Sequence, residues 1–303
     1  MRPRHFSFVV LAATLWGTGG AFGHALTLDS AVPPIAVAMW RILLAGLVLA
    51  AVLQLAGRLR LRDTSRGMWR RAALMAVLLA VFQAAYFAAV DRAGVGLATM
   101  VTIGSSPLAV ATFDTVVRRH RPSARTVAAL VLALAGLVAL TGGAAAAASG
   151  SRAVEGVVLA LAAGAAFAGV SLVASAAVRD WGGARLTAVA FTGGGLALVP
   201  VALVPVALAT GWAVPSGSTG WVLVGALAVI ATAVPHALYN AGLATVPAFV
   251  ATIVALLEPL VAAGIGVLAF SESLGPWQIV GALALGSAVV VLRPQRDAPV
   301  PLA

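Results

Sequence analysis

The chain has 303 residues, of which 62% are hydrophobic and only 9% are charged, and its mean hydropathy is +1.06. A soluble domain carries about 25% charged residues, so much of the outer surface of this protein must face an apolar medium such as a lipid bilayer. The absence of cysteine excludes disulfides, thiolate metal sites and a cysteine nucleophile. The net charge of +10 comes from arginines in short segments between apolar runs, which indicates membrane topology rather than binding to nucleic acid.

Ten apolar runs follow one another along the chain, and each has about the 20 residues that a helix needs to cross a hydrocarbon core of about 30 Å. The first is long, lacks a small-residue cleavage site and precedes nine others, so we interpret it as a retained helix rather than a signal peptide. We therefore expect an all-α integral membrane protein with ten transmembrane helices. Their predicted residues are 7–28, 33–56, 72–91, 95–117, 126–147, 155–178, 186–209, 220–242, 249–270 and 276–292.

The arginines are distributed unevenly between the two ends of these helices. With the N-terminus inside, sixteen of the nineteen arginines fall in inner segments, two fall in outer segments, and Arg41 lies within the second helix. Basic residues favour the cytoplasmic side of a membrane, so both termini are predicted to be cytoplasmic. The chain has no lysine and is rich in Ala and Gly, which favours a bacterial source. The predicted location is therefore the bacterial cytoplasmic membrane.

Two windows of the sequence resemble each other at a constant offset of 153 residues. YFAAVDRAGVGLAT at 86–99 aligns with YNAGLATVPAFVAT at 239–252, and Tyr86 falls opposite Tyr239. In each case the window joins the third and fourth helix of a five-helix half. This placement favours an internal repeat.

A second match lies just beyond those windows, where Pro107 falls opposite Pro259 after a shift of one residue. We expect two repeats, residues 1–147 and 148–303, with five helices each. Because five is odd, the second repeat enters the membrane from the opposite side, and such inverted repeats are typical of transporters.

Four motifs carry a resemblance to a known family. They are LWGT (15–18), WRILLAGLVL (40–49), AVDRAGVGLATM (89–100) and NAGLATVPAFVATIVALLEPLVAAGIGVLAFSESLG (240–275). With these motifs in order, the chain resembles the EamA group of the drug/metabolite transporter superfamily. The resemblance implies a secondary transporter that exports amino acids, other metabolites or drugs by alternating access, through a central cavity between the two halves.

Glu258 stands in the middle of a predicted helix, where an ionised carboxylate is costly and ionisable groups are candidates for function. We consider it the candidate for binding and releasing a coupled proton. The structural alternative is that Glu258 satisfies backbone groups freed by Pro259, which lacks an N–H. Pro107 and Pro259 are the predicted helix breaks. Arg41 is interpreted as reaching the interface or forming a structural ion pair, with contact to an anionic substrate group as the alternative.

Polar side chains share a face on two of the predicted helices. His236, Tyr239 and Asn240 lie three and four residues apart on the eighth helix, and Gln83 and Tyr86 lie three apart on the third. Such faces either line a cavity or form hydrogen bonds between helices. The residues predicted to line a substrate cavity are Trp16, Gln83, Tyr86, Ser106, His236, Tyr239 and Asn240.

An intramembrane enzyme and a channel are the alternative functions. An enzyme needs a cluster such as HExxH or a Ser–His–acid set, whereas the four histidines are scattered along the chain. A channel needs rings of carbonyl or carboxylate groups, and nothing in the sequence indicates one. The sequence also has no P-loop motif for binding ATP. We expect no catalysis, no metal, no cofactor and no nucleic-acid partner. The expected partners are a small-molecule substrate and the lipid bilayer, and a homodimer is left open.

Overall fold

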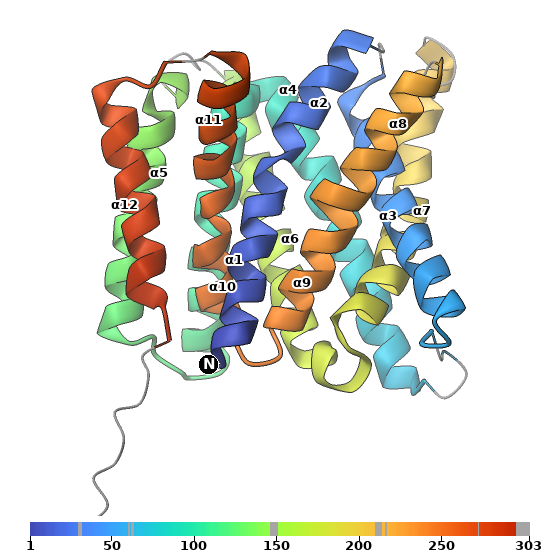
Figure 1. Ribbon diagram of the computed structural model, residues 1–303, viewed down its shortest axis with the longest axis horizontal. Helices are drawn as coiled ribbons and strands as arrows, with labels where there is room; N and C mark the ends of the chain where they lie inside the picture. Colours follow the sequence, from blue (N-terminus) through green and yellow to red (C-terminus); the bar gives the residue numbers. More distant parts are fainter. Residues whose placement is uncertain are drawn as a thin grey trace, which may run out of the picture.

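The computed structural model describes residues 1–29, 32–59, 61, 64–145, 151–209, 214–215, 217–271 and 273–294. All regular structure in these ranges is helical (Figure 1). The helices are α1 (Pro3–Gly17), α2 (Gly19–Asp29), α3 (Pro34–Leu55), α4 (Arg66–Val116), α5 (Ala124–Ala145), α6 (Ser151–Trp181), α7 (Gly183–Ala209), α8 (Gly217–Ala228), the π-helix η1 (Val229–Ala233), α9 (Val234–Gly242), α10 (Ala248–Ala255), α11 (Leu257–Phe270) and α12 (Pro276–Leu292).

The described part of the chain contains eight helical stretches that are long and apolar enough to cross a membrane, and α12 is a shorter apolar helix. Large apolar side chains are exposed along the outside of the bundle. The exposed fractions of Leu55 and Leu268, for example, are 89% and 88%. The prediction of an all-helical protein with apolar helices of membrane length is confirmed. The predicted boundary between repeats, at residues 147 and 148, lies outside the described residues.

The helix α4 is much longer than one membrane crossing. Its 51 residues would extend over about 77 Å as one straight helix. Gly94 interrupts it with φ 79° and ψ 158°, a conformation that glycine adopts and other residues avoid. The Tyr86 hydroxyl lies 2.8 Å from the Thr99 hydroxyl, a contact that thirteen residues of straight helix could not make. The chain therefore folds back at Gly94 into two limbs, residues 66–93 and 95–116.

Three other helical runs are broken near their middle. The first is divided between α1 and α2 at Thr18, whose hydroxyl donates to the Leu15 carbonyl over 2.7 Å. A π-helix separates α8 from α9, and Pro235 at the start of α9 has no N–H to continue the α-helical pattern. At Leu256 a further break separates α10 from α11. Such breaks expose backbone groups that side chains or ligands can bind.

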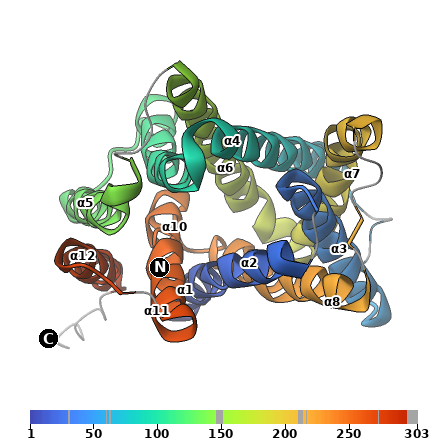
Figure 2. The same cartoon turned by 90° about the horizontal axis from the view of Figure 1, so that it is seen from above.

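Close helix pairs hold the bundle together through glycine. A Cβ added at Gly195 of α7 would lie 2.6 Å from the Leu43 Cα of α3. Between α5 and α12 the two glycines Gly136 and Gly281 face each other, and a Cβ at Gly136 would lie 2.8 Å from the Gly281 carbonyl oxygen. Figure 2 shows the pairs α3–α7 and α5–α12 from above. It also shows α6 beside α4, and α1 beside α10 and α11. In membranes, small residues permit this close approach of helix backbones.

Candidate functional site

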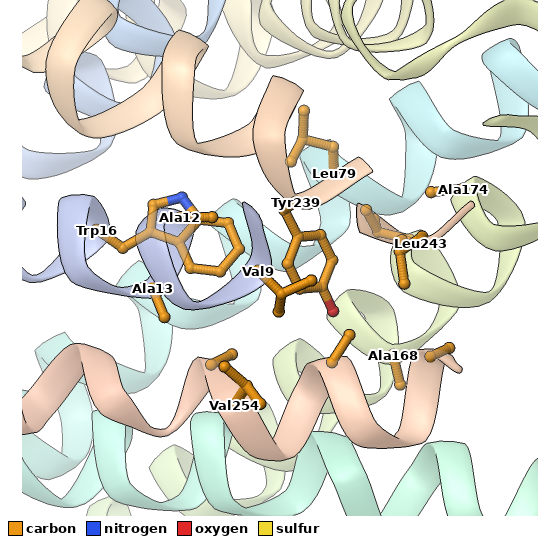
Figure 3. Close-up of a cluster of buried hydrophobic side chains, with 14 of the residues drawn as sticks. Val9, Ala12, Ala13, Trp16, Leu79, Ala168, Ala174, Tyr239, Leu243 and Val254 are labelled. Atoms are coloured by element: carbon orange, nitrogen blue, oxygen red, sulfur yellow. The ribbon is translucent and has the colours of Figure 1, made fainter. Parts of the chain in front are cut away.

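Trp16 lies near the end of α1, and aromatic side chains from two other helices surround its indole. The rings of His236 and Tyr239, both on α9, have centroids 4.8 and 5.1 Å from that of Trp16, and the Phe167 ring on α6 lies 6.1 Å away. Figure 3 shows the Trp16 and Tyr239 rings next to each other. These four residues, called the aromatic cluster below, connect α1, α6 and α9 in the middle of the bundle.

His236 has two competing hydrogen-bond partners for one ring nitrogen. Its Nδ1 lies 3.1 Å from the Trp16 indole nitrogen and 2.8 Å from the Thr232 carbonyl oxygen. The indole N–H can only donate and the carbonyl can only accept. When Nδ1 carries a proton it donates to Thr232, and when it does not it accepts from Trp16. The tautomer of His236 therefore decides which of the two helices it is bonded to.

Tyr239 is held by a second hydrogen bond between helices. Its hydroxyl lies 2.9 Å from the Ser171 hydroxyl of α6, and Ser171 in turn donates to the Phe167 carbonyl over 3.1 Å. Because Ser171 donates to that carbonyl, its oxygen is left to accept from Tyr239. Both polar groups are thereby satisfied, as groups buried in an apolar environment must be.

The helix breaks meet beside this cluster. Gly17, the last residue of α1, approaches α11 so closely that an added Cβ would lie 2.9 Å from the Glu258 carbonyl oxygen. His236 reaches back to Thr232 in the π-helix. Glu258 itself lies in the first turn of α11, where the helix dipole favours a negative charge. Three interrupted helices thus present their ends to one region of the interior.

Two ionisable side chains, a basic one and an acidic one, also lie inside the bundle. Arg41 of α3 and Glu258 interact electrostatically with each other and with Tyr86, and all three side chains retain some accessible surface. No ion pair between Arg41 and Glu258 is found among the described residues. The described part of the chain holds no group of three His, Cys, Asp or Glu side chains arranged for a metal ion.

Other predicted cavity residues lie outside the aromatic cluster. Gln83 is 2% exposed, and its Oε1 has no hydrogen-bond partner within the described structure. Tyr86 is joined to the cluster indirectly, because the Phe82 ring lies 6.3 Å from Tyr86 and 5.4 Å from Phe167. The third predicted helix therefore contributes two residues, Phe82 and Tyr86, to an extended aromatic row, and one buried amide, that of Gln83.

Ser106 and Asn240 make structural hydrogen bonds. Ser106 donates to the Ile103 carbonyl over 3.0 Å, and this is the carbonyl that Pro107, having no N–H, leaves without its helical partner. The helix α4 consequently continues through Pro107. Asn240 donates to the Thr187 hydroxyl of α7 over 2.9 Å and is buried. These contacts correspond to the interhelical and backbone alternatives that the sequence left open.

Sequence reasoning did not select the aromatic partners Phe82, Phe167 and Phe191 for the site. The Phe191 ring of α7 lies 4.6 Å from that of His236. Phenylalanine inside an apolar run is not distinguishable from lipid-facing or core phenylalanine, so only the rotation of each helix reveals its role. Phe167 and Ser171 lie four residues apart, and this shared face was the one signal available.

Comparisons with known proteins identify relatives over the whole chain. The EamA-like transporter family matches residues 5–142 and 154–293. An uncharacterized transporter of Bacillus subtilis (strain 168), YwfM, is 32% identical over 293 residues, which cover 96% of this chain and 94% of that protein. One crystal structure, at 19% sequence identity, has the same fold with a TM-score of 0.80 over 96% of this chain and 97% of the other.

These matches agree with the apolar helices of membrane length and with the predicted resemblance, which is confirmed. The protein is a multi-pass membrane transporter. The chain belongs to the EamA-like transporter family.

Proposed function

We propose that this protein is a secondary transporter that exports a small metabolite, an amino acid or a drug-like compound through the region where the helix breaks meet. One observation carries the proposal: the interrupted helices α1–α2, α8–α9 and α10–α11 converge on the aromatic cluster and Glu258. Discontinuous helices that meet inside a bundle are characteristic of substrate sites in transporters, because their ends offer unpaired backbone groups and dipoles. Trp16, Tyr86, His236 and Tyr239 are the proposed substrate contacts.

The proposal includes ten membrane crossings in two inverted repeats. Counting the two limbs of α4 separately, and each broken pair once, gives the ten crossings. Helix contacts support a twofold relation, because α3 packs on α7 and α5 on α12, which join corresponding crossings of the two halves. Likewise α6 packs along both limbs of α4, while α1 packs along α9, α10 and α11. The family match in two separate segments, 5–142 and 154–293, is consistent with such a duplication.

Glu258 is the proposed group that couples export to protons. A carboxylate inside a membrane is stabilised by a cation, by water or by a proton. A cationic group of the substrate and a proton would then compete for Glu258, so that their movements are linked. Arg41, whose charge interacts with Glu258, could meet an anionic group of the substrate. The proposed location is the bacterial cytoplasmic membrane with both termini cytoplasmic.

The experiment compares extracellular metabolites of cells that express wild-type protein, Trp16→Phe or Trp277→Phe. The matched control Trp277 is 76% exposed and lies outside the cluster. Wild type and Trp277→Phe should accumulate the same compound outside the cell. Trp16→Phe keeps an aromatic ring but loses the hydrogen bond to His236, and a loss of about 1 kcal/mol corresponds to roughly fivefold less export. Equal export by both variants, at equal protein abundance, would place the substrate away from the cluster.

A further inference from the structure

A groove lies on the face of α6 that is turned away from the aromatic cluster. It has a volume of about 560 Å³ and lies between the two limbs of α4, with α6 as its floor. The floor residues Ala165, Gly169, Leu172 and Ala176 follow one side of α6 at helical spacing, whereas Phe167 contacts Trp16 on the other side. The remaining lining residues are Arg71, Leu74, Leu78, Ala109, Phe113, Arg118, Ala168 and Val173.

The groove lies beyond the part of α6 that packs on α4 backbone near the fold at Gly94, while Gly169 within the groove lies against the Leu78 side chain. Near the fold at Gly94 a Cβ on Gly164 would lie 2.6 Å from the Thr102 carbonyl oxygen, and the Thr102 hydroxyl donates to the Ala160 carbonyl over 3.2 Å. Toward the other end the limbs diverge (Figure 1), and α6 offers small side chains. Leu74 and Phe113 are exposed at its rims. The groove is therefore apolar and opens outward, where lipid would surround the bundle.

Two arginines line one end of the groove: Arg71 lies on the first limb of α4, and Arg118 lies two residues beyond the end of the second limb. Arg71 donates to the Ala176 carbonyl of α6 over 3.2 Å. Arg118 pairs with Asp114 over 3.0 Å, and its guanidinium lies 5.3 Å from the centre of the Phe113 ring. These contacts fix both side chains at this end of the groove, called its mouth below. Arg71 makes other contacts as well, including one with the Met68 sulfur. A guanidinium has five donors, so an arginine with protein contacts can also bind a phosphate oxygen.

The arginine end of the groove has the tryptophans typical of a membrane interface and an excess of positive charge. Beside Arg71, the ring of Trp69 lies 5.7 Å from that of Trp181, and tryptophan gathers at the membrane interface. Segments 66–71 and 114–121 together contain six arginines and one acidic residue, Asp114. Asp114 offsets part of the charge of Arg118, and the neighbouring arginines leave the mouth cationic. An apolar slot that ends in cations beside such tryptophans matches an anionic amphiphile.

We propose that this groove binds an anionic phospholipid of the adjacent leaflet. Its phosphate would lie between Arg71 and Arg118, where guanidinium groups bind phosphate oxygens in bidentate fashion. One acyl chain would lie on the floor formed by Ala165, Gly169 and Leu172. The lipid fills the space between the two limbs of α4 and so braces this end of the bundle. The site is separate from the proposed substrate region.

The test uses purified protein in detergent with phosphatidylglycerol or phosphatidylcholine of identical acyl chains, measured by native mass spectrometry and by unfolding temperature. Wild type should bind phosphatidylglycerol more tightly and be stabilised by it. In the double variant Arg71→Gln/Arg118→Gln this preference should fall about tenfold, the effect of one lost charge-assisted hydrogen bond. The matched control Arg70→Gln/Arg119→Gln removes the same charge at the same end, outside the groove lining, and should keep the preference.

A second pair of variants tests the acyl slot without touching the arginines. Ala165→Phe fills the floor and should weaken both lipids alike, while Ala162→Phe, exposed on α6 outside the groove lining, should have no effect. Equal binding of the two lipids by wild type would overturn the proposal. So would equal losses in the two arginine pairs, which would indicate a diffuse charge effect. Should Arg71→Gln/Arg118→Gln not fold, the lipid preference of wild type and the result for Ala165→Phe decide the question.

Discussion

At the scale of single residues, the Tyr239–Ser171 bond shows how polar groups are accommodated inside this bundle. The Tyr239 hydroxyl donates to the Ser171 hydroxyl, and the Ser171 hydroxyl donates to the Phe167 carbonyl of its own helix. Hydrogen bonds between membrane helices contribute about 0.6 kcal/mol on average. The hydrogen bond should therefore contribute only modestly to stability. Its main effect should be to fix the position of the Tyr239 ring beside Trp16.

We predict that Tyr239→Phe and Ser171→Ala each lower the free energy of unfolding in detergent by about 0.6 to 1 kcal/mol. The double variant should lose no more than the larger single loss, because both substitutions remove the same bond. Unfolding curves for the three variants measure this. Losses that add up would show that the two hydroxyls act independently.

Glu258→Gln should fold and insert normally, because the amide keeps the shape and hydrogen-bonding capacity of the carboxyl group but cannot ionise. We predict that it flattens the pH profile of transport, measured in vesicles across pH 5 to 8. Glu155→Gln, which removes the exposed partner of Arg92, is the control and should leave the profile unchanged. An unaltered pH profile in Glu258→Gln would make Glu258 structural.

Part of the site was predictable from spacing alone. His236 and Tyr239 were selected because residues three apart share a helix face, and both contact Trp16. The same rule selected Asn240, which turns to Thr187 instead. Spacing shows which residues share a face of a helix, but a face about 100° wide can contact two different neighbouring helices. Whether a polar group lines a cavity or bonds a neighbour depends on the rotation of its helix, which no single sequence pattern contains.

At the scale of helices, the apolar runs were predictable because crossing a hydrocarbon core demands about 20 apolar residues. The interruptions within them were harder to predict. Pro259 lies beside a real break, yet α4 continues through Pro107 because Ser106 supplies the missing donor. The break at Thr18 lies beside Gly17, which approaches α11 closely, and nothing local in the sequence distinguishes this glycine from others.

The fold of α4 at Gly94 leads to a prediction about its stability. Any other residue there would be forced into a conformation reserved for glycine, at a cost of about 1 to 3 kcal/mol. Gly94→Ala should accordingly lower the unfolding temperature. Gly264→Ala in α11 is the control, since it has open space around it and no positive φ, and should be neutral or slightly stabilising. Equal behaviour of the two variants would show that the turn at Gly94 is not strained by a side chain.

At the scale of the whole molecule, the two ends of the bundle differ in net charge. The arginines at the end assigned to the outside are paired with acids: Arg92 lies 3.3 Å from Glu155, and Arg152 lies 3.4 Å from Asp91. Exposed pairs of this kind contribute little to stability, but they leave that end nearly neutral. The opposite end keeps its excess of arginine, as the rule of positive inner segments requires.

Topology reporters test the proposed orientation. Fusions after residues 64, 121 and 183 should report the cytoplasm, and fusions after residues 149 and 215 should report the outside. The ten crossings and the position of both termini depend on this alternation. One reversed report among the five would require a different path through the membrane.

Accessibility of a single cysteine tests the central claim most directly, because the chain has none of its own. In His236→Cys the thiol faces the proposed substrate region, whereas in Val234→Cys, two residues earlier and 40% exposed, it faces lipid. A charged, membrane-impermeant thiol reagent reacts only where water reaches the thiolate. We predict that it labels His236→Cys in intact cells or inverted vesicles, that substrate slows this labelling, and that Val234→Cys is not labelled from either side. Absence of labelling at His236→Cys from both sides, or equal labelling of the two positions, would contradict a substrate region at the meeting point of the helix breaks.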